Sequence, residues 1–258
     1  MNNPFVLTKD AVPSKGRVAL NYLIVCVFVL AVFWIALGAI GYRLDFAFVD
    51  RFSERIVDGF ILTLQVSAVS LVFSLPLGAL VAAGKGSRIL PLRYLCDLYV
   101  KIIRGTPLIM QIYLFFYIVG TAVGVEDRFI SGVLILSVFE GAYIAEIIRG
   151  SLLSIDATQR DAARAVGFTR AQTFFHIILP QVCKRVLLPV TNEVITLVKD
   201  TALASTVAVS ELMNVAKKQV SGTSSIEPYV VAMIIYLILN GVAEQVCKWV
   251  ERKMNYYK

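Results

Sequence analysis

Residues 156–182 read DATQRDAARAVGFTRAQTFFHIILPQV, a polar, alanine-rich stretch that stands between two strongly apolar regions. Alanine favours helix, and Asp156 is a suitable N-cap residue. Asp161 lies early in the first predicted helix, where the helix dipole favours negative charge. Gly167 permits a turn, after which a second helix is predicted to begin at Phe168. The sequence therefore predicts two short helices joined at a glycine, with small side chains that let another protein approach closely.

The composition around this segment is that of a membrane protein. Of the 258 residues, 58% are hydrophobic and only 17% are charged, and the mean hydropathy is +0.75. Such values are atypical of soluble domains. A helix needs about 20 mostly apolar residues to cross the roughly 30 Å of hydrocarbon in a bilayer. Six runs meet this requirement, near residues 20–42, 59–83, 99–122, 129–148, 186–206 and 229–247.

The distribution of basic residues predicts the orientation, because Lys and Arg are retained on the cytoplasmic side. With both termini inside, the cytoplasmic side receives most of these residues, including all three arginines of 156–182. The polar segment is therefore expected in the cytoplasm. The first apolar run is longer than the 7–15 residues typical of a signal peptide, so we interpret it as a span.

Several classes of function are disfavoured. The net charge of +7 is explained by membrane-flanking basic residues better than by nucleic-acid binding. The four cysteines are scattered and His176 is the only histidine, so neither a metal site nor a disulfide framework is expected. Residues 84–87, GKGS, lack the spacing of a phosphate loop. We expect no catalytic residues and no cofactor bound by this chain.

The polar segment resembles the cytoplasmic EAA loop of ABC importer permeases, whose pattern is EAA-x3-G-x9-I-x-L-P. Asp161-Ala162-Ala163, Gly167 and Ile177-x-Leu179-Pro180 match it, with Asp in place of Glu at the first position. From the composition alone, an amphipathic connector without a partner remains an alternative.

Further stretches, over about residues 55–250, are similar to the polar amino acid subgroup, which includes histidine, glutamine and arginine permeases. They are Gly59, Thr63-Leu64, Arg104 to Leu108, Ala142-Tyr143-x-Ala145-Glu146 and Lys199-Asp200-Thr201. Thr158 in place of the usual Gly, and Glu140, depart from the family.

The resemblance implies an all-α integral membrane protein with about six transmembrane helices. The expected fold is that of a type I ABC importer permease, with one additional N-terminal helix. The expected division is residues 1–57 for the N-terminus, additional helix and outer loop, 58–250 for the permease domain and 251–258 for a cytoplasmic tail. The residues expected to bind and couple an ATPase are Asp161, Ala162, Ala163, Gly167, Arg160 and Arg164.

The resemblance also implies an assembly in the bacterial cytoplasmic membrane. Its other members are ATPase subunits that bind ATP and Mg²⁺, a second identical or homologous permease, and an extracytoplasmic substrate-binding protein. Besides these proteins, the expected contacts are membrane lipid and an amino acid substrate.

Ionisable side chains within the spans are candidates for substrate binding, because charges in hydrocarbon are costly. Glu193, Thr196 and Asp200 share one face of the predicted fifth helix, and Asn192, Thr196 and Lys199 form an overlapping stripe. These five residues, with Gln111 and Tyr143, are the candidate substrate site. A salt bridge of Lys199 with a carboxylate, or a structural network, explains the same charges. Glu146 and Arg149 are spaced to pair, whereas Glu140 and Glu146 are separated by about 120° around the helix.

Two alternatives remain open at this point. The cargo of such an importer is a polar amino acid, or else an opine, a sulfur amino acid or another small zwitterion. An ion-coupled secondary transporter or channel would use the membrane carboxylates to move protons or cations, but it leaves the polar cytoplasmic motif unexplained.

Overall fold

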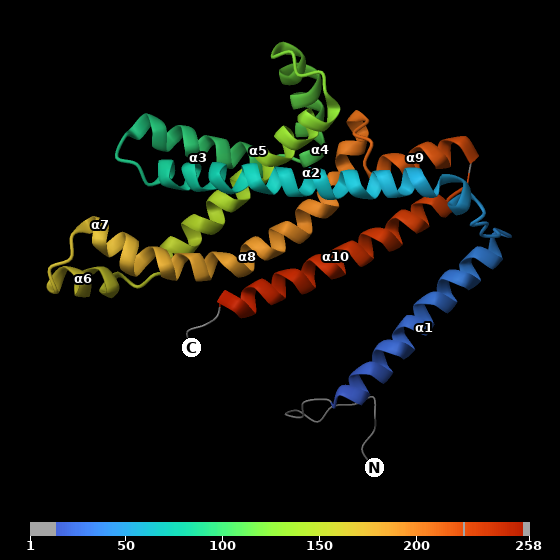
Figure 1. The fold of residues 1–258 in the computed structure, drawn as a ribbon, viewed down its shortest axis with the longest axis horizontal. Helices are drawn as coiled ribbons and strands as arrows, with labels where there is room; N and C mark the ends of the chain where they lie inside the picture. The colour runs from blue at the N-terminus through green and yellow to red at the C-terminus, as the bar shows by residue number, and fades with distance from the viewer. Residues whose placement is uncertain (1–13, 224, 255–258) are drawn as a thin grey trace. The chain divides into compact units, whose positions relative to one another are not determined.

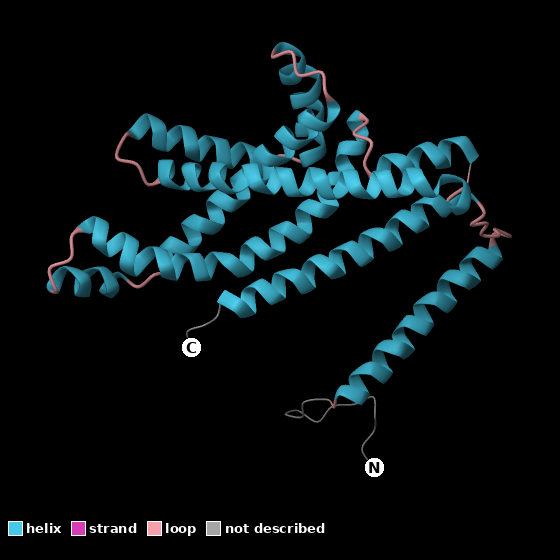
Figure 2. Cartoon of the chain, in the orientation of Figure 1, coloured by secondary structure: helices cyan, strands magenta, loops and turns pink. Residues whose placement is uncertain are grey.

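The computed structural model describes residues 14–223 and 225–254, and every regular element within these ranges is a helix (Figures 1 and 2). The chain forms two compact units, Met1–Phe48 and Val49–Lys258. The first contains α1 (Lys15–Ala39), whose N-terminus is capped by the side chain of Ser14. Large apolar side chains such as Phe28 and Trp34 are exposed on α1. A helix that is hydrophobic all round suits a lipid environment, as expected for the additional N-terminal span.

The second unit comprises the remaining helices. They are α2 (Phe48–Lys85), α3 (Leu90–Gly105), α4 (Leu108–Leu114), the π-helix η1 (Phe115–Gly120), α5 (Arg128–Leu153), α6 (Ala157–Ala165), α7 (Arg170–Gln172), the π-helix η2 (Thr173–Ile178), α8 (Leu179–Asp200), the 3₁₀-helix η3 (Thr201–Val207), α9 (Leu212–Thr223) and α10 (Glu227–Met254). In Figure 1, α6 and α7 lie together at one end of this unit, and α9 lies at the other. Residues 1–13 and 255–258, parts of the predicted N-terminus and tail, lie outside the described residues.

The charged segment before the second span is mostly helical. An outer loop or an interfacial helix is predicted over residues 43–58, and the structure has helix from Phe48 onward, continuous with the span in α2. The backbone departs from helical geometry at Phe52 (φ −117°, ψ 15°), so the first turn is set off from the rest. The division between the two compact units falls at the start of this helix.

The third predicted span, near residues 99–122, is bent in the structure. The helix begins earlier, at Leu90, and breaks at Thr106-Pro107, where α3 and the segment Leu108–Gly120 are bent by 112°. The residue before a proline is driven out of helical geometry, and Thr106 is extended (φ −126°, ψ 149°). In the part of the chain that the structure describes, five helical segments are long and apolar enough to cross a membrane, and six result if the bent pair forms one span.

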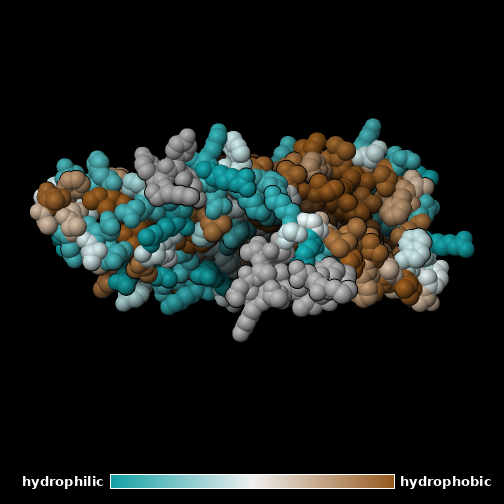
Figure 3. Space-filling view, turned by 90° about the horizontal axis from the view of Figure 1, so that it is seen from below, coloured by the Kyte–Doolittle hydropathy of each residue, from teal (hydrophilic) through white to brown (hydrophobic). Residues whose placement is uncertain are grey.

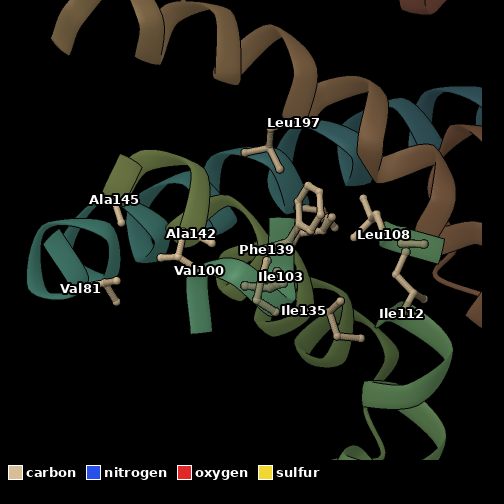
Figure 4. Packing of buried hydrophobic residues seen from close by; sticks show 14 of the residues in the cluster. Val81, Val100, Ile103, Leu108, Ile112, Ile135, Phe139, Ala142, Ala145 and Leu197 are labelled. Carbon is tan, nitrogen blue, oxygen red and sulfur yellow. The ribbon is translucent and has the colours of Figure 1, made fainter. Parts of the chain in front are cut away.

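The main core of the second unit is formed by five helices, α2, α3, α4, α5 and α8, together with Ala204 and Val207 of η3. Figure 4 shows side chains from all five helices converging, among them Val81, Ile103, Leu108, Phe139 and Leu197. Small residues allow close approach: a Cβ at Gly78 would lie 2.5 Å from Cγ2 of Ile144 on α5. Such packing through small residues is typical of helices in membranes.

The outer surface is strongly apolar. Val72 and Leu80 of α2 and Leu237 of α10 are among the many large hydrophobic side chains that remain exposed. Figure 3 shows broad hydrophobic areas at the surface beside hydrophilic ones. An exposed apolar surface of this extent is suited to lipid rather than water.

Candidate functional site

The polar segment 156–182, which we call the coupling loop, forms two short helical pieces. Asp156 caps α6, with its carboxylate accepting the backbone N–H of Thr158 at 2.9 Å. This hydrogen bond stabilises the charged form and lowers the pKa of Asp156. Thr169 caps the second piece in a capping box with Gln172. Both cap positions agree with the helices that the sequence predicts.

Gly167 makes the turn between the two pieces. Its φ is +82°, in the left-handed region that L-residues avoid, and the N–H groups of Gly167 and Phe168 satisfy the last carbonyls of α6. A Cβ at this position would meet no atom within 4 Å. The glycine is therefore needed for its backbone conformation and not for space.

The two alanines of the motif face in different directions. Ala163 is 2% exposed, whereas Ala162 and Asp161 are exposed. Asp161 pairs with Arg164 at 3.6 Å, and both side chains remain largely in solvent. One alanine thus anchors α6 to the protein while the other leaves a low, charged surface open to a partner.

A cavity of about 280 Å³ lies beside this surface. Its lining combines basic and apolar side chains: Leu152, Arg160, Arg164, Phe168, Arg170, Thr173, Phe174 and Ile178. The expected coupling residues Arg160 and Arg164 line this cavity, and Arg170 adds a third guanidinium. This composition suits an acidic or apolar side chain from another protein.

The ends of the coupling loop are fastened to each other. Ile155, Ile178 and Val182 form a small buried cluster where the chain leaves α5 and enters α8. The guanidinium of Arg185 donates to the backbone carbonyl of Ser154 and, at 2.7 Å, to its hydroxyl. The end of α5 and the start of α8 are thus joined at the base of the loop.

The candidate membrane site lies along α8 and its contact with α5. Glu193, Thr196 and Asp200 are partly buried, whereas Asn192 and Lys199 are exposed. The face of Glu193, Thr196 and Asp200 is thus turned partly inward, whereas Asn192 and Lys199 of the second predicted stripe lie at the surface. Within residues 14–223 and 225–254, Lys199 forms no ion pair, so the predicted alternative of an internal Lys199 salt bridge is not observed.

Glu140 on α5 belongs to the same site, although the sequence analysis did not place it there. It is 1% exposed, and its Oε1 has no hydrogen-bond partner among the described residues. It lies on α5, which packs against α8, the helix that bears Glu193 and Asp200. We call Glu140, Glu193 and Asp200 the membrane carboxylates. The signal in the sequence was an isolated acid in an apolar run, but only helix packing shows which helix it faces.

Tyr143, one turn after Glu140 on α5, packs against an aromatic ring and a guanidinium. Its ring lies 5.0 Å from that of Phe139, and the guanidinium carbon of Arg104 lies 5.2 Å from its centroid. Arg104 comes from the last turn of α3.

Gln111 has a local role. Its side-chain amide donates to the carbonyl oxygens of Ile103 and Thr106, at 2.7 and 3.1 Å, and it also lies 2.8 Å from the Thr106 hydroxyl. The side chain is 7% exposed. Gln111 therefore holds the break between α3 and α4, because the helix there cannot satisfy its own carbonyl groups.

Beyond Arg104, an ion-pair network ties α2, α3 and α5 together. Glu146 lies 2.5 Å from Lys85, 2.8 Å from Arg149 and 3.5 Å from Arg104. The carboxylate of Asp97 also forms ion pairs with Lys85, at 3.3 Å, and with Lys101, at 2.7 Å. The network borders a cavity of about 610 Å³. The Glu146–Arg149 pair was predicted, but the contacts of Lys85, Asp97 and Arg104 depend on helices distant in sequence.

A buried polar network fixes the opposite end of the unit. The carboxylate of Glu211, which is fully buried, accepts the backbone N–H groups of Met213 and Asn214 and the hydroxyl of Tyr236 at 2.6 Å. The N–H of Leu212 donates to Thr63 Oγ1 at 3.2 Å. These contacts hold the start of α9 against α2 and α10. Thr63 therefore has a structural role at this end.

Comparisons with known proteins agree with this geometry. Residues 74–256 match the family described as binding-protein-dependent transport system inner membrane component. The chain is 35% identical over 203 residues to the L-cystine transport system permease protein TcyB of Bacillus subtilis, covering 77% of this chain and 86% of that protein. It is 32% identical to the arginine transport system permease protein ArtQ of the same organism (82% and 98%). It is 35% identical to the octopine permease OccM of Rhizobium radiobacter (82% and 93%).

Solved structures have the same fold. An amino acid ABC transporter crystallised with histidines superposes with a TM-score of 0.76 at 30% identity, covering 82% of this chain and 99% of that one. The methionine ABC transporter MetNI, in an inward-facing conformation, gives a TM-score of 0.65 at 19% identity (82% and 100%). The second likeness concerns the fold alone.

Proposed function

Because this chain belongs to the family of binding-protein-dependent transport system inner membrane components, a family of multi-pass permeases, we propose that it carries a polar amino acid in an ATP-driven importer. The name of one relative supports this cargo, since the arginine permease ArtQ is similar over most of its length. The single observation that carries the proposal is the join between the coupling loop and the two helices that bear the membrane carboxylates.

In this proposal, separate ATPase subunits bind to the exposed surface of α6. Asp161, Ala162, Arg160 and Arg164 are exposed there, beside the basic and apolar cavity. ATP and Mg²⁺ are bound by those subunits, and this chain supplies the surface that they move. A second permease subunit completes the membrane pathway, and an extracytoplasmic binding protein delivers the amino acid. The distribution of Lys and Arg supports a cytoplasmic position for both termini and for the coupling loop.

Transport then follows from a two-state motion. When the ATPases close on ATP, α6 is displaced, and the Arg185–Ser154 contacts carry the displacement into α5 and α8. The membrane carboxylates lie on these two helices, so their exposure to the two sides changes with the state of the ATPases. ATP hydrolysis resets the first state. The chain supplies two conformations and their coupling rather than bond chemistry.

The octopine and cystine permeases among the relatives favour a second candidate cargo, an opine or a sulfur amino acid. It uses the same assembly and coupling loop. Competition of the labelled substrate by octopine and by cystine in an uptake assay distinguishes these cargoes from ordinary polar amino acids.

The assembly is tested by co-purification from native membranes, followed by mass spectrometry of the intact complex. We expect two permease subunits, two ATPase subunits and, in the presence of substrate, a binding protein. Recovery of a stable chain without any ATPase, under conditions that preserve other importers, would contradict the proposal.

A further inference from the structure

The cavity of about 610 Å³ beside the ion-pair network, which we call the basic cavity, holds more positive charge than its own carboxylates balance. Its acidic lining residues are Asp97 and Glu146. Its basic lining residues outnumber them by three and are Lys85, Arg93, Lys101, Arg104 and Arg149. Clefts lined by charge of one sign attract ions of the opposite sign. The coupling and transport steps proposed above do not use this excess of charge.

Both carboxylates of the basic cavity are already engaged by three of its cations. Lys85, whose side chain is 12% exposed, lies 2.5 Å from Glu146 and 3.3 Å from Asp97. Lys101 lies 2.7 Å from the second oxygen of Asp97. The guanidinium of Arg149 donates from Nε and Nη2 to the two carboxylate oxygens of Glu146, at 3.0 and 2.8 Å, a strong bidentate arrangement. Little of either carboxylate is left for the other basic residues.

Arg93 and Arg104 are the cations with donors to spare. Arg93 is exposed, and it forms no ion pair with any residue in 14–223 or 225–254. The side chain of Arg104 is 43% exposed, and its ion-pair contact within the same ranges is the 3.5 Å approach of Nη1 to Glu146. A guanidinium carries five N–H donors in a fork that matches the oxygens of a phosphate. The open donors of the basic cavity are therefore suited to an oxyanion.

The opposite face of α3 is apolar. Leu95, Leu98 and Ile102 recur at i, i+3 and i+7, so they share one helix face, and each is more than half exposed. Tyr94 is also exposed, and it lines the basic cavity beside this apolar face. In Figure 1 the turn from α2 to α3 lies at the same end of the second unit as α6 and α7. Basic pockets between transmembrane helices bind the headgroups of anionic lipids.

We propose that the basic cavity binds a phosphate group through Arg93 and Arg104, and that an anionic phospholipid brings this group. The acyl chains then contact the apolar face of α3. A soluble phosphate ester shares the headgroup chemistry and is the other source. The inference goes beyond the proposed function and does not depend on the cargo. A zwitterionic amino acid brings no net negative charge and a cationic one adds to the excess, so neither balances the cavity as a phosphate does.

The test uses the intact complex as purified from membranes, transferred into a neutral detergent and freed of native lipid. Native mass spectrometry counts retained phosphatidylglycerol and phosphatidylcholine, and equilibrium dialysis measures binding of radiolabelled glycerol 3-phosphate. We expect phosphatidylglycerol to be retained in preference to phosphatidylcholine, and glycerol 3-phosphate to bind more weakly. Arg93→Gln should weaken retention by about tenfold, because it removes a charge-assisted contact. Arg88→Gln is the matched control and should retain lipid as the wild type does, because Arg88 is exposed in the turn before α3 and does not line the cavity.

Equal retention of the two lipids, together with binding of glycerol 3-phosphate that is lost in Arg93→Gln, would uphold the phosphate site and assign it to a soluble ester. Failure of both phosphatidylglycerol and glycerol 3-phosphate to bind would overturn the inference. Equal losses in Arg93→Gln and Arg88→Gln, or displacement of the phosphate ligand by arginine or glutamine, would overturn it as well. Arg104→Gln should weaken the same binding as Arg93→Gln does, so the test remains decisive if one variant does not fold.

Discussion

The coupling loop and the membrane carboxylates use charge in opposite ways. Around the loop, Asp161 and Arg164 are solvated, and their mutual pairing is weak. Within the predicted spans, Glu140 is almost fully buried, and one of its oxygens has no hydrogen-bond partner among the described residues. The first arrangement presents exposed charges to a protein partner. The second leaves a carboxylate oxygen buried without a partner among the described residues. The comparison suggests that substitutions in the loop break assembly, whereas substitutions among the carboxylates break transport in an assembled complex.

The largest expected effect is that of deleting Ala162 and Ala163. Removal of two residues turns the rest of α6 by about 200°, so the buried anchor is lost and the charged surface is redirected. We expect the ATPase to be absent from the purified complex and uptake to be abolished. Ala162→Ser keeps a small, exposed side chain and serves as the control. Normal ATPase recovery with the deletion would show that α6 is not the binding surface.

Combined replacement of Glu193→Gln and Asp200→Asn tests the other half of the comparison. Two carboxylates that we place against the substrate are neutralised with little change in shape. Uptake at limiting substrate should fall by roughly tenfold or more, since each charge-assisted contact is worth about 1.5–3 kcal/mol. The ATPase should still co-purify, and Glu244→Gln should transport normally. Wild-type uptake by the double variant would exclude these carboxylates from the site.

Glu146→Gln is expected to have a moderate effect on stability. Its carboxylate is 16% exposed and serves Lys85, Arg104 and Arg149 at once. Loss of the charge leaves these cations without their shared partner, and we expect a loss of about 1–3 kcal/mol. Thermal unfolding of the purified protein measures it. Glu244→Gln removes an exposed pair with Lys248 and should lose less than about 0.5 kcal/mol. Equal shifts would mean that the network adds no stability.

The smallest expected effect is a difference between alanine substitutions at two glycines. At both positions an added Cβ would have open space around it. Gly167 has a φ of +82°, whereas Gly150 lies within α5. Gly167→Ala should destabilise the loop by about 1–2 kcal/mol, because alanine is strained in the left-handed region. Gly150→Ala should be neutral or slightly stabilising. Hydrogen exchange of α6 in the two variants measures the difference, and identical exchange would show that the turn conformation is not limiting.

The sequence predicted the coupling loop well because its structure is local. Asp156 caps the helix that follows it, and Gly167 makes the turn, through contacts a few residues apart. The number of spans also followed from apolar runs. The bend at Thr106-Pro107 was missed because the hydropathy of the run continues through it, although the proline was a signal for a break.

The membrane site was predicted only in part, for a related reason. Glu193 and Asp200 share a helix face, so their spacing is visible in the sequence. Glu140 lies on α5, and its relation to α8 depends on packing between helices more than fifty residues apart along the chain. Gln111 looked like a lining residue, but its amide is engaged by the backbone at the helix break. The roles of such residues follow from contacts that no short pattern contains.

The central claim is that motion of the coupling loop, driven by ATP, moves an amino acid past the membrane carboxylates. It is tested most directly in proteoliposomes that contain the complete complex, with the binding protein and radiolabelled arginine outside and ATP inside. We predict uptake that requires ATP and the binding protein and that is lost in the Ala162–Ala163 deletion. Uptake that proceeds on a proton or sodium gradient without ATP would contradict the account and indicate a secondary transporter.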